Sequence, residues 1–441
     1  MDVVRKYGKF ILNPSPTTTW KIIRGVLHWI TLPIKLAIIG GLGFYQIFKH
    51  RNDKSREVAV QYELPNPKEV AKYLPVWITT NFKAYVCRTY TDEVIDGTNH
   101  NPDHMCSRHG TYTFLMDLIG QREFSMDRVS ATMMAGDRLA RGFNYNEQIT
   151  YNGRTTSGDM LCGLNMAMLN NQHDGLLEKY ELLVQGIIDN DFSLLENQLP
   201  DHEEVGAELW EELARKDNGS YANIKMKSAR GMWQPGLETV GAQALTILST
   251  LKLCYKKTRN PHAKEMYDKL FTQYGYGILS LFPTAYIDKQ RGYFNDHNCM
   301  ISLYVLSKLA DTAFEKFLYK KAMQYVWSLS SHWYNGYYTG LLLDAYPELL
   351  KKPKYSKQLD KCLEYLGEAD FRNMMQSPES YVRKDSTSIP PPLRLIAEDE
   401  FYPDIQHDKE IESVTPGTRW YRTGLGYFAS LVMCLKAKGK L

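Results

Sequence analysis

The chain has 441 residues, of which 44% are hydrophobic and 12% aromatic, so it can bury the core of one large domain or two small ones. Its net charge is only +3, which argues against a dedicated nucleic-acid-binding protein. The charge is unevenly placed, since residues 1–57 hold ten Lys/Arg and three Asp/Glu, or 10 − 3 = +7, which leaves 3 − 7 = −4 for the remainder. The basic excess therefore belongs to the N-terminal segment.

The first predicted element is hydrophobic. A basic segment, 1–24, precedes the stretch GVLHWITLPIKLAIIGGLGFYQIF at 25–48, and a polar linker follows at 49–66. About 20 residues suffice to span a bilayer, although a lysine near the middle, Lys35, costs roughly 2.5–3.5 kcal/mol on insertion scales. We expect 25–48 to cross the membrane once or to lie in its interface, with lipid as its partner; a helix that binds another protein is the alternative. Basic residues on both flanks leave the side of the membrane open.

After the linker one pattern recurs six times: a loop with Gly and aromatic or charged residues, a helix of small and apolar residues, and a more amphipathic helix with Lys and Glu. The small and apolar stretches, expected to be inner helices, are 111–120, 160–169, 237–255, 297–310, 337–346 and 423–437. The amphipathic stretches, expected to be outer helices, are 126–143, 174–189, 261–275, 312–329 and 354–367, with 67–80 as the partner of the last inner helix.

This pattern predicts an all-α domain over residues 67–441. An inner helix contacts other helices on every side and is apolar all round, whereas an outer helix keeps a solvent face. Six such pairs favour an (α/α)6 toroid, and their irregular spacing disfavours a regular solenoid. An unspecific helical bundle or an irregular α-solenoid is the alternative.

The six loop-and-helix units resemble the six-hairpin glycosidase-like superfamily, which includes unsaturated glucuronyl hydrolases, several glycoside hydrolases and the toroid domains of polysaccharide lyases. The resemblance covers about residues 67–441 and lies in the architecture and in the style of the loops. It implies an enzyme that acts on carbohydrate.

In such a toroid the loops before the inner helices line one end, where helix N-termini add partial positive charge and free N–H groups. Trp and Tyr can stack on sugar faces there, and Arg can pair with uronate or sulfate. The candidate catalytic residues are Asp159, Glu238, Asp296 and His297. The candidate substrate-binding residues are Arg108, His109, Arg154, Trp233, His332, Trp333, Tyr337, Tyr421 and Arg422.

Two mechanisms use different members of this set. Glycoside hydrolysis needs two carboxyl groups, about 5–5.5 Å apart for retention or 6.5–9.5 Å for inversion, and two of Asp159, Glu238 and Asp296 could supply them. A lyase needs a His or Tyr base and an Arg or Asn that neutralises the uronate. The residues for that mechanism are His109, His297, His332, Tyr421 and Asn295. Each acid also has an ordinary alternative role at a helix start.

The cysteines form no CxxC pair, and four lie in apolar helical runs, so we expect buried free thiols at Cys162, Cys254, Cys299 and Cys434. The sequence NPDHMCSRHG has no matching second half for a metal site, so neither metal nor cofactor is expected.

The leading hypothesis is a membrane-anchored enzyme that hydrolyses an acidic glycan by carboxylate general acid/base chemistry. One alternative is a polysaccharide lyase that uses His or Tyr. The other is a non-enzymatic helical toroid that serves as a membrane-associated scaffold or binding module.

Overall fold

The computed structural model describes eleven stretches of the chain. They are 63–74, 76–78, 83–85, 105–140, 158–171, 174–189, 240–273, 275–281, 293–331, 334–368 and 425–441. They are mostly helical, which confirms the all-α prediction at that level. The predicted segments 1–24 and 25–48, and nearly all of the linker 49–66, lie outside these residues.

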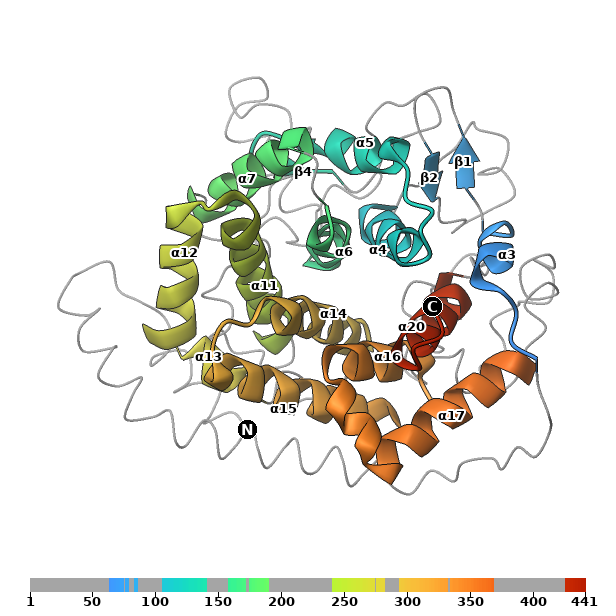
Figure 1. The fold of residues 1–441 in the computed structure, drawn as a ribbon. Helices are drawn as coiled ribbons and strands as arrows, with labels where there is room; N and C mark the ends of the chain where they lie inside the picture. The colour runs from blue at the N-terminus through green and yellow to red at the C-terminus, as the bar shows by residue number, and fades with distance from the viewer. Residues whose placement is uncertain are drawn as a thin grey trace, which may run out of the picture.

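Six helices lie toward the middle of the molecule (Figure 1). They are α4 (Met105–Leu118), α6 (Gly158–Leu169), α11 (Val240–Thr258), α14 (Tyr293–Leu309), α16 (Gly336–Ala345) and α20 (Leu425–Ala437). Each contacts the next in that order, and α20 contacts α4 again. They are buried nearly all round, as from Leu425 to Leu435 of α20, because helices surround them on every side.

Shorter or more amphipathic helices lie outside these six (Figure 1). They are α3 (Pro67–Ala71), α5 (Phe124–Thr132), α7 (Asp174–Asp189), α12 (Pro261–Asp268), α15 (Ala313–Ser330) and α17 (Pro353–Glu368). The minor elements are the antiparallel pairs β1 (Val76–Ile78) with β2 (Lys83–Tyr85) and β3 (Met134–Ala135) with β4 (Arg138–Leu139), the π-helix η3 (Lys269–Gln273), α13 (Tyr276–Leu279) and the 3-10 helix η5 (Pro347–Lys351).

Local signals in the sequence set several helix starts. The Asn260 side chain accepts a hydrogen bond from the Ala263 N–H at the start of α12. A proline occupies the first helical position, where a backbone N–H would have no partner within the helix, so its missing N–H costs nothing. Thr312 and Glu315 form a reciprocal capping box at the start of α15. The Asn335 side chain accepts the Tyr338 N–H and so begins α16.

Two predicted outer helices are wrong in part. Helix 67–80 ends at Ala71, and Val76–Ile78 is strand β1, because a proline at position 75 disfavours helix for the residue before it. Helix 126–143 ends at Thr132, and the chain turns at Gly136, whose φ of 58° suits a tight hairpin.

Two predicted loops are also helical. The sequence CSRHG, expected to precede the first inner helix, lies within α4, which begins at Met105. Most of the loop RGYFND likewise lies in α14, which begins at Tyr293. Arg108, His109 and Asp296 are therefore helical residues rather than loop residues.

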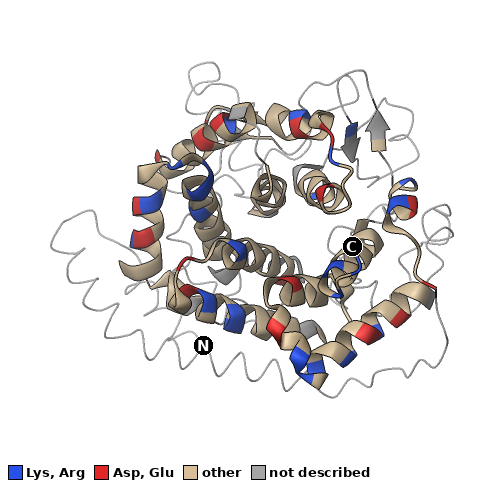
Figure 2. Ribbon diagram, viewed as in Figure 1, with Lys and Arg blue, Asp and Glu red and all other residues tan. Residues whose placement is uncertain are grey.

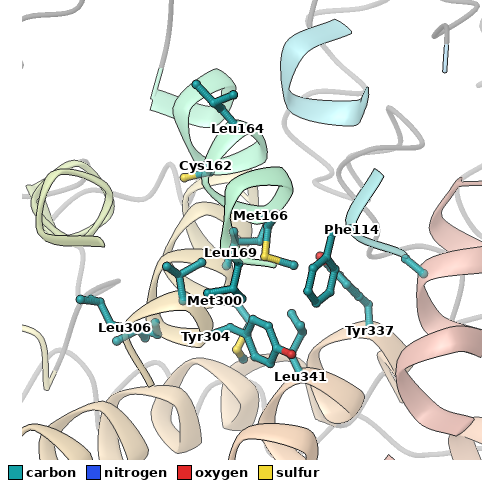
Figure 3. Packing of buried hydrophobic residues seen from close by; sticks show 14 of the residues in the cluster. Phe114, Cys162, Leu164, Met166, Leu169, Met300, Tyr304, Leu306, Tyr337 and Leu341 are labelled. Atoms are coloured by element: carbon teal, nitrogen blue, oxygen red, sulfur yellow. The ribbon is translucent and has the colours of Figure 1, made fainter. Parts of the chain in front are cut away.

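The space between the inner helices is filled by side chains (Figure 3). Phe114 of α4 packs edge-to-face on Tyr304 of α14, with ring centroids 5.8 Å apart. Met166 of α6, Met300 of α14 and Leu341 of α16 lie near this pair, and all five side chains are buried. The middle of the described helices is thus an apolar core.

Glycines set the closest approach in this core. A Cβ placed on Gly163 of α6 would lie 2.1 Å from the Ser107 carbonyl oxygen of α4, and one on Gly110 would lie 2.0 Å from the Gly163 carbonyl oxygen. Both neighbours are backbone atoms, which a rotamer change cannot move. Only glycine at both positions permits this helix crossing.

A buried ion pair connects the inner helix α11 to the outer helices α12 and α15. The Lys252 ammonium of α11 donates to Glu315 Oε1 of α15 over 2.8 Å and lies 4.6 Å from the ring centroid of Tyr267 of α12. The Tyr267 hydroxyl donates to the same carboxylate oxygen over 2.5 Å, and the N–H groups of Asp311 and Thr312 donate to Oε2. Burial alone would raise the pKa of Glu315, but these donors outweigh it and hold that pKa below its usual 4.5.

Candidate functional site

The structure brings together polar side chains from the first turns of α14 and α16. The His297 ring centroid lies 5.9 Å from that of Tyr337 and 6.3 Å from that of Tyr338. The two tyrosine rings are 6.3 Å apart, and Asp296 precedes the histidine in the chain. All four side chains are buried. We call these four residues the α14–α16 cluster.

Helix starts produce this cluster. Tyr334 adopts a left-handed φ of 56°, and the following Asn335 caps α16, so Tyr337 and Tyr338 fall in its first turn. Asp296 lies in the first turn of α14, where a carboxylate is favoured by the helix dipole. Because both helices begin here, an acid, an imidazole and two phenols share one end of the helix pair.

The same end continues toward α6 and α11 through small polar groups. The Cys162 thiol of α6 lies 3.2 Å from the Thr246 hydroxyl of α11, 3.5 Å from the Ser302 hydroxyl of α14 and 3.8 Å from the Asn298 carbonyl oxygen that follows the cluster. Cys162 is buried, as the sequence predicts, and so are Cys254, Cys299 and Cys434; among the described residues none of the four is in a disulfide bond.

The first turns of α4 hold two predicted substrate-binding residues, Arg108 and His109, and both are buried. The His109 Nε2–H donates to the Met126 carbonyl of α5 over 2.9 Å, so its ring connects an inner helix to an outer one. Burial lowers the pKa of His109 from 6.5 to about 4; the bond to Met126 opposes this shift, and the charge of Arg122 adds to it. His109 is therefore neutral near pH 7, and its contacts are those of a structural side chain.

This gives a pH-dependent stability. Between pH 6.5 and 4 the unfolded chain protonates His109 while the folded chain does not, so folding free energy is lost as the pH falls through this window. At about pH 5 the expected loss is about 2 kcal/mol relative to pH 7. Urea unfolding of His109→Gln, which keeps an N–H donor but does not titrate, should show a change between these pH values smaller by that amount. Equal changes in the parent and the variant would contradict a neutral buried His109.

The remaining predicted site residues lie mostly outside the described part of the chain. These are Glu238, Arg154, Trp233, His332, Trp333, Tyr421 and Arg422. Asp159 is the second residue of α6, where only its backbone is described. The separation of the three candidate carboxyl groups therefore stays a prediction.

The sequence alone missed Tyr338 and the group formed by Cys162, Thr246 and Ser302. Tyr338 follows a candidate residue directly, and its helical partner Asn335 was a visible capping signal. Thr246 and Ser302 are isolated hydroxyl residues in otherwise apolar helices. Such residues can be assigned to buried polar contacts only when the neighbouring helices are known.

Among the described side chains, no group of three His, Cys, Asp or Glu residues is placed to hold a metal ion. Within the same residues, no helix is both long and apolar enough to cross a bilayer. No protein family model, curated protein or solved structure matches the chain.

Proposed function

We propose that the helical domain is an (α/α)6 toroid and that the chain is a membrane-anchored enzyme acting on an acidic glycan. Each of the six inner helices contacts the next one along the chain, and the last, α20, contacts the first, α4; this closed sequence of contacts supports the toroid. The outer helices alternate with them along the chain, as a six-hairpin ring requires.

The observation that carries the enzymatic proposal is the α14–α16 cluster. The imidazole of His297 lies beside the two phenols near the starts of two helices, and the buried Asp296 precedes the histidine in α14. The partial positive charge at helix N-termini favours bound anions. Figure 3 shows one member of the cluster, Tyr337, among buried apolar side chains such as Phe114 and Leu341. General acids and bases in a desolvated site are the groups that glycan cleavage needs.

One mechanism for this site is elimination, and the two tyrosine rings near His297 support it, because a lyase needs a His or Tyr base and an acid partner. As base, His297 would take the proton from C5 of a uronate, and a tyrosine would protonate the departing oxygen at C4. The C5–H electrons form the C4–C5 double bond as the C4–O bond breaks, so no water is consumed. The buried Arg108 is a candidate partner for the uronate carboxylate.

Hydrolysis is the second mechanism, and Asp296 favours it. A buried Asp296 would serve as general acid if a second carboxyl stands across the glycosidic bond. Asp159, at the start of helix α6, which contacts α14, is a candidate for that second carboxyl.

Incubation with a panel of acidic oligosaccharides separates these mechanisms. Elimination yields an unsaturated uronate that absorbs in the ultraviolet, whereas hydrolysis yields new reducing ends without that absorbance. We expect His297→Gln and Tyr337→Phe each to lower turnover by at least about 10²-fold, the low end for a general acid or base, with little change in melting temperature.

The matched control is Tyr346→Phe. It removes a buried hydroxyl at the opposite end of α16, where it donates to Ser307 over 2.9 Å, and should leave turnover unchanged. If the parent chain cleaves none of the oligosaccharides, the enzymatic proposal fails and a non-enzymatic scaffold is favoured instead. If it cleaves equally well without His297, the cluster is not the site.

A further inference from the structure

The outward side of α15 exposes large apolar groups. Phe314 and Phe317 are each 53% exposed, although both stand on a helix whose other side is buried. Their spacing of three residues places them on one face. The Phe314 ring is held edge-to-face on Phe271 of η3, with centroids 6.4 Å apart. Lys321, one turn further, lies 5.8 Å from the centroid of the Phe317 ring.

The same helix and the segment after α16 carry seven lysines. They are Lys316, Lys320, Lys321, Lys351, Lys352, Lys354 and Lys357, on α15, η5 and the start of α17. The same stretches, 313–330 and 347–357, contain two acids, Glu315 and Glu348, so their net charge is 7 − 2 = +5. The chain totals +3, which leaves 3 − 5 = −2 for everything else. Figure 2 shows the basic residues along α15 and at the beginning of α17.

The two acids offset only part of this charge. Glu315 is buried in the pair with Lys252, and Glu348 is paired with Lys320. Lys316 and Lys321 are exposed, and neither forms an ion pair with a described carboxylate.

The two stretches form one surface. Lys354 lies 4.9 Å from the centroid of the Trp327 ring, and Gln324 donates to the Tyr355 hydroxyl over 2.6 Å. We call Phe314, Phe317 and these seven lysines the α15 face.

We propose that the α15 face docks on a bilayer rich in anionic phospholipid. Phenylalanines at the boundary of headgroups and acyl chains, flanked by lysines over the phosphates, are the arrangement by which an interfacial helix binds. Each lysine near an anionic surface adds about 1 kcal/mol. A second copy is disfavoured as the occupant, because two faces of charge +5 repel.

The predicted membrane segment at 25–48 makes a bilayer accessible to this face. The linker 49–66 has 18 residues and spans at most about 60 Å when extended. The domain is therefore tethered within reach of the surface on which the α15 face would lie. This orientation is independent of the enzymatic proposal, because no residue of the α14–α16 cluster belongs to the face.

Vesicle flotation of the full chain tests the docking. Neutral phosphatidylcholine vesicles report the contribution of other segments, and vesicles with 30% phosphatidylserine add the anionic one. Phe314→Ser/Phe317→Ser should lower the partition coefficient on anionic vesicles at least about 10-fold. Lys316→Gln/Lys321→Gln should lower it by a similar factor, in a salt-dependent way, and leave binding to neutral vesicles unchanged.

The matched control is Phe124→Ser/Leu182→Ser. It removes two equally exposed apolar side chains, 61% and 59%, from the outer helices α5 and α7, and should bind like the parent. Unchanged binding of either α15 variant overturns the proposal, as does an equal loss in the control. A change of the phenylalanine variant from oligomer to monomer, measured by light scattering, would also overturn it and assign the face to a second copy.

Discussion

Gly163→Ala should destabilise the folded chain by about 3 kcal/mol or more, at the upper end for overpacking. The new methyl group would overlap the backbone of Ser107, whose oxygen lies 2.1 Å and whose Cα lies 2.3 Å from the ideal Cβ position. Helices α4 and α6 would have to separate, and the apolar contacts around Phe114 would loosen with them. Equilibrium urea unfolding, followed by far-ultraviolet circular dichroism, measures the loss.

Gly175→Ala is the matched control, because a Cβ on that helical glycine of α7 meets no atom within 4 Å. It should be neutral or stabilise by up to about 1 kcal/mol, since alanine favours helix over glycine. A Gly163→Ala variant that unfolds within about 0.5 kcal/mol of the parent would show that α4 and α6 do not cross this closely.

Lys252→Met should cost about 3–5 kcal/mol, the usual penalty when one partner of a buried ion pair is removed. The loss leaves the Glu315 carboxylate buried with only hydroxyl and N–H donors, so its charge lacks a counterion nearby. The adjacent Asp311, which also contacts Lys252, is largely exposed and can turn to water. Urea unfolding at pH 7 measures the difference.

A double-mutant cycle identifies the cause. Lys252→Met/Glu315→Met removes both charges, and we expect it to recover part of the loss, because no isolated buried charge remains. The exposed pair Lys72 and Glu69, at 2.8 Å, is the control, and Lys72→Met should cost less than about 1 kcal/mol. Additive losses at 252 and 315 would mean that the two residues stabilise the chain separately.

Whether a predicted site residue belongs to the site depends on which other side chains it contacts in the folded chain. His297 and Tyr337 were predicted from their positions at helix starts, and the structure places their rings together with that of Tyr338. Asp296, predicted in the same way, is buried in the first turn of α14. His109 had the same signal in the sequence, but its ring faces Met126 of α5. The residue type at a helix start is therefore not enough to predict a site residue, because the direction of a side chain depends on its angular position around the helix.

The sequence by itself determined the helical class and most inner helices. Stretches such as 160–169 and 337–346 are apolar all round and begin after Gly, Asn or Asp, so burial and capping give the same answer from local residues alone. The sequence also predicted buried thiols such as Cys162, because a small apolar side chain in an apolar helix is buried in any packing.

Only the tertiary structure decided which helices meet and how closely. Gly110 and Gly163 are 53 positions apart, and nothing in either local sequence indicates that their backbones touch. The pairing of Lys252 with Glu315, the contact of His297 with Tyr337 and the exposure of Phe314 depend likewise on long-range packing. Local periodicity fixes which face of a helix is apolar, but the partner of that face is selected by the shape and charge of distant segments.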